Sequence, residues 1–110
     1  MAQNQSSGVF ISKELSEYLD TLESDNKIKK WIDDMENILK ENKLAGQSIP
    51  KKQIPKRYID RYGVNNLFRY QHPEGYRSCY TLLNIEGVGV CPIILDIMTH
   101  KEYNIVFGYK

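Results

Sequence analysis

Cationic side chains are the residues with the clearest capacity for chemistry in this sequence, and most of them lie in its middle third. Residues 43–77 carry eight Lys or Arg against two acidic residues, a local charge of +6, although the 110-residue chain has a net charge of only +1. Because charges are screened over roughly 10 Å, a concentrated basic segment can bind a phosphate backbone whatever the total charge. The distribution favours nucleic acid binding, with a solvated basic loop as the alternative.

The candidate RNA-binding residues are the cations of this segment and one histidine that lies near them in sequence. They are Lys51, Lys52, Lys56, Arg57, Arg61, Arg69 and His72. Tyrosines interleave with these residues, as platforms for base stacking would require. Half-buried strand tyrosines would give the same pattern, and an ordinary turn histidine is the alternative for His72.

His100 is the second histidine, and the two cysteines are the other reactive side chains. The unperturbed pKa of histidine lies near 6.5, so His100 could act as a general base or acid, or it could form local hydrogen bonds at a helix start. Cys79 and Cys91 lie in strand-like runs without the CxxC spacing of a zinc site. We therefore expect reduced thiols, no bound metal and no cofactor.

Two helices in the first half are expected to form a hairpin. Ser12 stands where a helix N-cap should, with Glu14 in the first turn. Apolar residues then recur with helical spacing at Leu15, Tyr18, Leu19 and Leu22, and again, after a break at residues 24–26, at Ile28, Trp31, Ile32, Met35, Ile38 and Leu39. These stripes favour core contacts, and a partner-binding groove is the alternative.

The second half carries the periodicity of strands. Residues 67–72, 76–85 and 88–97 are rich in aromatic and β-branched residues, which predicts an antiparallel meander with a type I turn over residues 72–75. Thr99 and Glu102 form a capping-box pattern that predicts a short helix from about His100 to Phe107. Residues 42–66 form a long basic connector, in which a short helix over 56–62 or a functional loop is expected. The whole chain, 1–110, is expected to be one α+β domain.

Two stretches of the sequence resemble the RelE/ParE toxin superfamily. Residues 67–80, LFRYQHPEGYRSCY, look like the strand, turn and Gly-Tyr-Arg pattern of RelE-type toxins, and residues 90–101 are similar to the family's last strand and the corner that follows it. The resemblance covers residues 67–107. It implies an N-terminal helical hairpin packed on an antiparallel β-sheet, with a short C-terminal helix.

The resemblance also implies an activity and its residues. RelE-like proteins are metal-independent endoribonucleases, or mRNA interferases, in which the ribose 2′-hydroxyl attacks the adjacent phosphate. Arg77 matches the family's arginine after Gly-Tyr and would hold the phosphate, with an exposed strand arginine paired to an acid as the alternative. Lys101, next to His100, matches the family's last-strand arginine. Phe107 stands where the family has a tyrosine acid, so Tyr103 or Tyr109 would supply the proton, or would only pack.

The implied partners are a cognate antitoxin protein and messenger RNA on the ribosome. A ParE-like toxin that binds DNA gyrase, or a non-catalytic RNA-binding or protein-binding relative, are the alternatives with the same fold. Residues 1–7 lack the apolar region of a secretory signal, and the uncharged run of residues 87–95 is far shorter than the roughly 20 residues that span a membrane. We therefore expect a cytoplasmic protein with no membrane partner.

Overall fold

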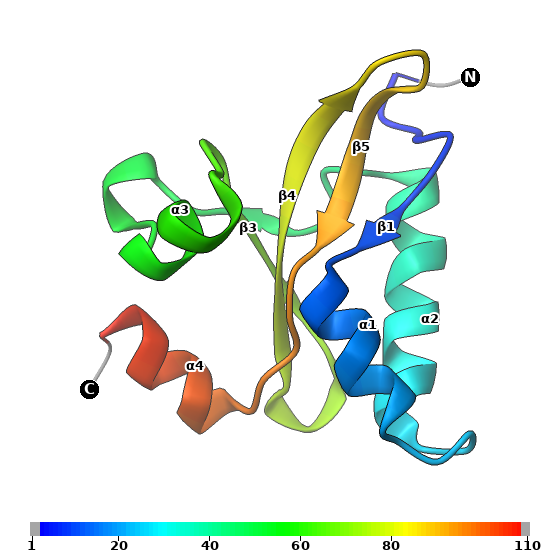
Figure 1. Ribbon diagram of the computed structural model, residues 1–110, viewed down its shortest axis with the longest axis vertical. Coiled ribbons are helices and arrows are strands. Elements are labelled where there is room, and N and C mark those ends of the chain that lie inside the picture. The colour runs from blue at the N-terminus through cyan, green and yellow to red at the C-terminus, as the bar shows by residue number, and fades with distance from the viewer. Residues whose placement is uncertain (1–2, 109–110) are drawn as a thin grey trace.

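A computed structural model describes residues 3–108, in which four α-helices lie on the two faces of a five-stranded sheet (Figure 1). The helices are α1 (Lys13–Asp20), α2 (Lys27–Glu41), α3 (Lys56–Tyr62) and α4 (His100–Phe107). The strands are β1 (Phe10–Ile11), β2 (Gln47–Ser48), β3 (Phe68–Gln71), β4 (Arg77–Ile85) and β5 (Gly89–Ile94). Short 3₁₀ turns occupy Lys51–Gln53 and Pro73–Gly75. The predicted α+β class is confirmed.

The helices begin where capping side chains satisfy their first backbone N–H groups. The Ser12 hydroxyl accepts a hydrogen bond from the backbone of Leu15 at 3.0 Å, which starts α1 as predicted. The Asn26 side chain does the same for α2. Thr99 and Glu102 form the predicted capping box, with bonds of 2.9 and 3.1 Å, and fix the start of α4.

The sheet is mixed, with the strand order β1-β5-β4-β3-β2. Strands β3, β4 and β5 form the predicted antiparallel meander, and β2 adds an antiparallel edge. The expectation of a wholly antiparallel sheet is wrong, because β1 pairs with β5 in parallel through Phe10 opposite Ile93 and Ile11 opposite Ile94. A two-residue strand shows no alternation that the sequence could reveal.

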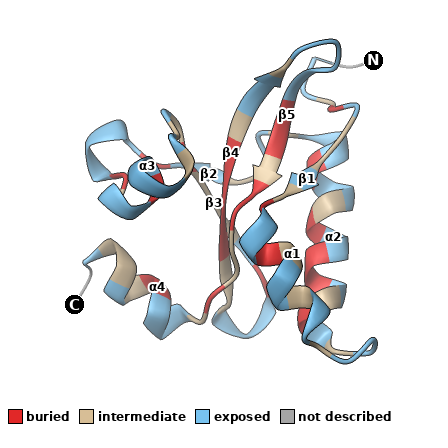
Figure 2. Cartoon of the chain, viewed as in Figure 1, coloured by how far each residue is buried: buried red, intermediate tan, exposed pale blue. Residues whose placement is uncertain are grey.

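Two hydrophobic clusters fill the space on the two sides of the sheet (Figure 2). On one side α1 and α2 pack against Tyr80 of β4. On the other side α3 and α4 pack against its neighbour Cys79, because successive strand residues face opposite ways. The apolar stripe of α2 is buried as expected except for Ile38, which is 44% exposed.

The turn between β3 and β4 differs from the predicted type I turn. Glu74, its third residue, has a left-handed φ of 60°, whereas a type I turn requires a negative φ there. The Glu74 carboxylate lies 2.7 Å from the ammonium of Lys27 at the start of α2. The turn thereby contacts the helical layer beside the sheet.

The basic connector contains the helix α3, over the residues that the sequence predicted. Tyr58 of α3 is buried, and together with Ile49 and Ile54 it joins the cluster on this side of the sheet. Gly63 ends the helix with a left-handed φ of 64°, which glycine adopts without steric cost. The connector is therefore held against the sheet through these three apolar side chains.

Candidate functional site

Two arginines from adjacent strands lie on the face of the sheet that α3 and α4 cover. Arg69 of β3 is paired with Cys79 of β4, and Arg77 precedes Cys79 by two residues. Side chains two apart on a strand share a face, so all three point to the same side. The interval from Arg69 to Arg77, with the turn between them, therefore brings two guanidinium groups to one surface.

Tyr103 of α4 lies between these arginines and joins them. Its side chain is almost fully buried, with 1% exposed. The guanidinium carbon of Arg77 lies 4.9 Å from the centre of the Tyr103 ring, and that of Arg69 lies 5.7 Å from it. Arg69 also donates a hydrogen bond to the Tyr103 hydroxyl at 3.2 Å and another to the Gln47 side chain of β2. Cation–π contacts and hydrogen bonds thus fix the position of both cations.

His100 adds an imidazole to this cluster. Its Nδ1 contacts the guanidinium of Arg77, and its Nε2 lies 3.2 Å from the side-chain amide of Asn104. A guanidinium has only donors, so Nδ1 accepts a hydrogen bond from Arg77. The amide nitrogen of Asn104 faces Nε2 on the other side of the ring. Arg77 and Asn104 together therefore fix the orientation of the His100 ring.

The charge of the two arginines is not neutralised by acidic side chains. Among residues 3–108, no carboxylate lies within 4.0 Å of either guanidinium. The Nε atoms of Arg69 and Arg77 are buried and have no hydrogen-bond partner in the same part of the chain. Buried polar groups of this kind are nearly always satisfied in proteins. We call Arg69, Arg77, His100 and Tyr103 the arginine cluster, and its chemistry suits an anion with several oxygens, such as a phosphate.

The structure does not bring every candidate catalytic residue into the arginine cluster. Lys101 is exposed and follows His100 on α4, so its side chain leaves the helix about 100° round from that of His100. Tyr109 lies outside the described residues. Phe107 packs its ring on Tyr103 at a centroid distance of 4.3 Å. Tyr103 is therefore the phenol that stands beside the arginines in the described part of the chain.

His72 lies on the opposite face of the sheet from the arginine cluster. Its side chain is 7% exposed, and its Nε2 lies 2.7 Å from the Ser78 hydroxyl. The ring packs near Trp31 of α2 and Tyr70 of β3. Burial lowers the pKa of His72 to about 4, so the ring is neutral at physiological pH. The structure therefore separates His72 from Arg69 and Arg77, although the three are close in sequence.

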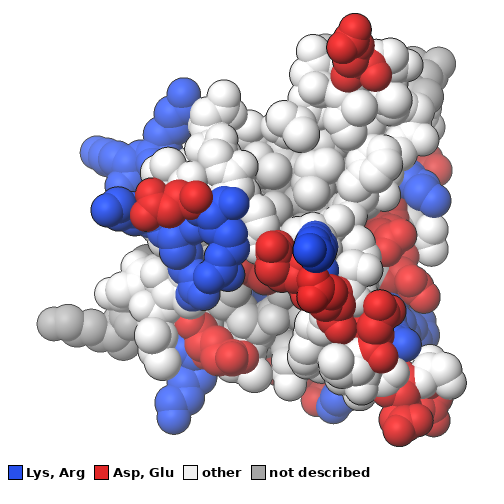
Figure 3. Space-filling model, viewed as in Figure 1, with Lys and Arg blue, Asp and Glu red and all other residues white. Residues whose placement is uncertain are grey.

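The cations of the connector lie on the same side of the sheet as the arginine cluster and are exposed. Lys51 and Lys52 sit on the first 3₁₀ turn, and the others are on α3, namely Lys56, Arg57 and Arg61. Figure 3 shows basic side chains concentrated over the α3 region of the visible face, and acidic ones gathered over α1 and α2. The basic segment found in the sequence is thus a basic surface over one layer of the molecule.

Sequence reasoning missed Gln47 and Asn104, which hold the arginine cluster in place. Gln47 reaches Arg69 because β2 pairs with β3 in the register that sets these two residues opposite each other. No local pattern reveals that register. Asn104 stands four residues after His100 on α4, so helical spacing could have indicated it.

No family model matches the chain, and neither a curated protein nor a solved structure does. Within residues 3–108, no helix combines the length and apolar character that crossing a membrane requires. A function is therefore inferred from the sequence and the geometry of this chain.

Proposed function

We propose that the chain is a RelE-like toxin, a metal-independent endoribonuclease that cleaves messenger RNA on the ribosome and that a cognate antitoxin holds inactive. The observation that carries the proposal is the pair of arginines on one sheet face. Neither has a carboxylate within 4.0 Å among the described residues, and an imidazole and a phenol touch them. The resemblance of residues 67–107 to the family supports the same function. The order of α1 and α2 before the meander and α4 supports the hairpin-on-sheet fold that the resemblance implies.

The cleavage would divide its tasks among the residues of the arginine cluster. Arg77 and Arg69 would bind the non-bridging phosphate oxygens and stabilise the charge that grows on them in the transition state. Once the donors of Arg77 bind the phosphate oxygens, Nδ1 of His100 loses its hydrogen-bond donor and can take the proton of the ribose 2′-hydroxyl. The 2′-oxygen then bonds to phosphorus and the bond to the 5′-oxygen breaks.

Tyr103 is the proposed acid for the leaving 5′-oxygen. Its hydroxyl carries a proton and already accepts a hydrogen bond from Arg69. Negative charge that develops on the phenolic oxygen as it gives up the proton is stabilised by that guanidinium. Tyr103 thus takes the role that Phe107 cannot fill.

The test is cleavage of messenger RNA in a translating extract. The intact protein is expected to cut ribosome-bound messenger RNA and to leave ribosome-free RNA intact. Arg77→Ala is expected to reduce cutting by a factor of about 10² to 10³, as loss of one transition-state donor does elsewhere. Lys40→Ala, which removes an exposed cation on α2, is the matched control and is expected to keep full activity.

Two further variants separate the roles within the arginine cluster. Tyr103→Phe keeps the ring between the arginines and removes only the hydroxyl, and His100→Gln removes the imidazole. Each is expected to slow cutting by a factor of about 10² or more, while the melting temperature stays close to that of the parent. Absence of cutting by the folded parent protein, with active ribosomes present, contradicts the proposal.

A ParE-like toxin that binds DNA gyrase is the second candidate. Phe107 favours it, because the phenyl ring at the family's tyrosine position packs against Tyr103 and Tyr58 and offers no proton. This candidate predicts inhibition of gyrase supercoiling by a protein that leaves messenger RNA intact. If both assays are negative, the third alternative remains, a non-catalytic relative that binds RNA or protein.

A further inference from the structure

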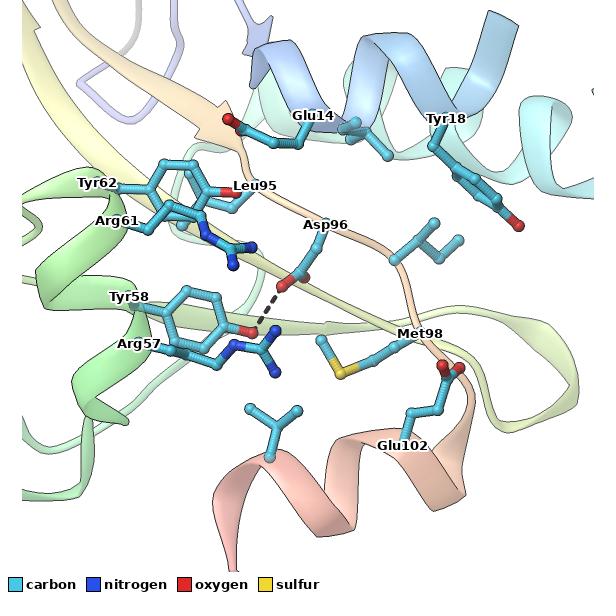
Figure 4. Close-up of a pocket in the computed structure, with 13 residues that line it drawn as sticks. Glu14, Tyr18, Arg57, Tyr58, Arg61, Tyr62, Leu95, Asp96, Met98 and Glu102 are labelled. Atoms are coloured by element: carbon cyan, nitrogen blue, oxygen red, sulfur yellow. Dashed lines mark hydrogen bonds between the residues drawn. The ribbon is translucent and has the colours of Figure 1, made fainter. Parts of the chain in front are cut away.

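A pocket of about 240 Å³ opens between α1, α3 and α4, beside the arginine cluster but separate from it (Figure 4). Its floor is the segment that leads from β5 to α4, residues 95–98. Met98 lines the pocket and exchanges two backbone hydrogen bonds of 2.8 Å with Arg77. The backbone pairing of Met98 with Arg77 therefore connects the pocket to the arginine cluster.

Donors line one side of this pocket. Arg57 and Arg61 are one turn apart on α3, and both guanidinium groups extend toward Asp96 in the middle of the pocket (Figure 4). Neither forms an ion pair within 4.0 Å with a carboxylate of residues 3–108. Both arginines therefore have donors that a ligand can use.

Acceptors line the other sides. Asp96 lies on the floor, with Glu14 entering from α1 and Glu102 from α4. The Asp96 oxygens accept one hydrogen bond from the Tyr58 hydroxyl at 2.6 Å and one from the Cys79 backbone at 3.0 Å. A carboxylate has about four lone-pair positions, so Asp96 retains capacity for further donors.

Rings and a thioether complete the walls. The half-buried ring of Tyr62 lies on the α3 side, its centroid 6.4 Å from that of the buried Tyr58, and the exposed Tyr18 and the buried Met98 lie on the opposite side. Flat apolar walls of this kind suit a planar ring system, because aromatic side chains stack on nucleobases. A planar ligand would meet arginine donors along one edge and carboxylate acceptors along another.

We infer that this pocket binds a guanine base. Guanine offers O6 and N7 as acceptors, which arginine recognises in pairs, and it also carries the N2 amino donors that a carboxylate accepts. Adenine lacks the O6 acceptor and places its amino group on the edge that faces the arginines, so it would set donor against donor. Arginine donors on one side of the pocket and carboxylate acceptors on the others therefore select guanine over adenine.

This inference rests on the proposed function for the source of the base, since an RNA held at the arginine cluster would place a neighbouring nucleotide at the pocket. The same base could also come from a free guanine nucleotide. Binding can be measured without cleavage, so the pocket and the proposed nuclease can fail independently.

The first measurement is calorimetric titration of the intact protein with guanosine and with adenosine, which carry no phosphate for the arginine cluster to bind. Guanosine is expected to bind at least tenfold more tightly than adenosine. Arg57→Ala and Arg61→Ala are each expected to weaken guanosine binding about tenfold or more and to leave adenosine binding unchanged. Lys40→Ala, which removes an exposed cation on α2 that does not line the pocket, is the control and is expected to change neither.

Equal binding of the two nucleosides, or guanosine binding that persists unchanged in both arginine variants, overturns the inference. A second pair of titrations identifies the source of the base, with guanosine 5′-monophosphate and with a single-stranded hexanucleotide RNA that contains one guanine. Tighter binding of the RNA that falls at least tenfold in Arg77→Ala supports an RNA base joined to the arginine cluster. Equal binding of both, unaffected by Arg77→Ala, contradicts the link to RNA.

Discussion

Tyr103 serves the arginine cluster through its ring and its hydroxyl at once. The ring is buried between the sheet and α4 and carries the cation–π contacts with Arg69 and Arg77. The hydroxyl accepts the hydrogen bond from Arg69. Truncation to alanine would remove a core side chain, at a cost of about 3–5 kcal/mol, together with any chemical role. Tyr103→Phe is therefore the substitution that separates the packing of the ring from the chemical role of the hydroxyl.

His72 gives a prediction on the pH dependence of stability. Its pKa is about 4 in the folded protein, below the unfolded value near 6.5, so the unfolded chain binds more protons between these values. The contribution of the neutral His72 ring to stability is therefore fully present above about pH 6.5 and is lost as the pH falls toward 4. Between pH 7 and pH 5, we expect the free energy of unfolding of the parent protein to fall by about 1 kcal/mol more than that of His72→Gln. Urea denaturation of both proteins at each pH measures the difference.

The glutamine side chain in that variant can still bond to the Ser78 hydroxyl, which lies 2.7 Å from the His72 ring, but it does not titrate. The difference between the two pH profiles therefore reports the protonation of His72 alone. Parallel pH profiles for the two proteins would contradict a neutral, buried His72.

For single residues, the sequence predicted those that a local motif marks. The Gly-Tyr-Arg pattern singled out Arg77, and the structure places this residue at the centre of a cationic cluster. Arg69 points away from Phe68 and Tyr70, toward the side where Arg77 lies. Gln47 could not be predicted, because its contact depends on how β2 and β3 align, and strands with exposed polar residues leave that register unspecified.

A hydrogen bond adds to the apolar packing that attaches α3 to the sheet. The Tyr58 hydroxyl donates to Asp96 at 2.6 Å, and Tyr58 is 1% exposed. Burial raises the pKa of Asp96, and burial beside that carboxylate raises the pKa of Tyr58 well above its usual range. Tyr58 therefore keeps its proton and donates a hydrogen bond to Asp96, which helps to hold α3, and with it Arg57 and Arg61, against the strand end.

Removing this donor is expected to destabilise the protein. Tyr58→Phe keeps the packed ring but leaves one oxygen of a buried carboxylate without its partner, which costs about 1–3 kcal/mol. Urea denaturation monitored by circular dichroism measures the loss. Ile59→Ala, at a residue of α3 that is 47% exposed, is the control and is expected to cost much less. Equal losses in the two variants would mean that the Tyr58 hydroxyl contributes nothing.

Elements with strong local signals were predicted, and those without such signals were not. The starts of α1 and α4 follow from capping side chains, and α3 and α4 have the predicted bounds. The strands β1 and β2 are two residues each and form through pairing with β5 and β3, which lie far from them in the sequence. Strands this short show no hydrophobic alternation, so the sequence alone could not predict them.

The molecule carries its charges in separate layers. Acidic residues concentrate on α1 and α2, and basic residues on the connector and α3, while the net charge is only +1 (Figure 3). Binding of single-stranded RNA to the basic layer is expected to release counterions, so that the logarithm of affinity falls with the logarithm of salt concentration by about 0.7 per phosphate contact. That the chain forms one domain stays a prediction.

Fluorescence anisotropy of a labelled single-stranded RNA, across about 50 to 200 mM salt, measures this slope. Lys52→Ala is expected to reduce the slope by about the value of one contact. Lys40→Ala, on the acidic layer, is expected to leave it unchanged. An affinity that does not respond to salt would contradict phosphate binding by this layer.

The short parallel contact between β1 and β5 has a consequence for synthesis of the chain. Ser12, which caps α1, also donates to the Leu95 carbonyl at 2.7 Å, across 83 positions of sequence. Contacts of such separation form late, because the intervening chain must first be ordered. While translation proceeds from the N-terminus, α1 and α2 therefore have no sheet to pack on until β4 and β5 are made. The residues of the arginine cluster all lie from Arg69 onward, so the protein acquires them only after most of its length has been translated.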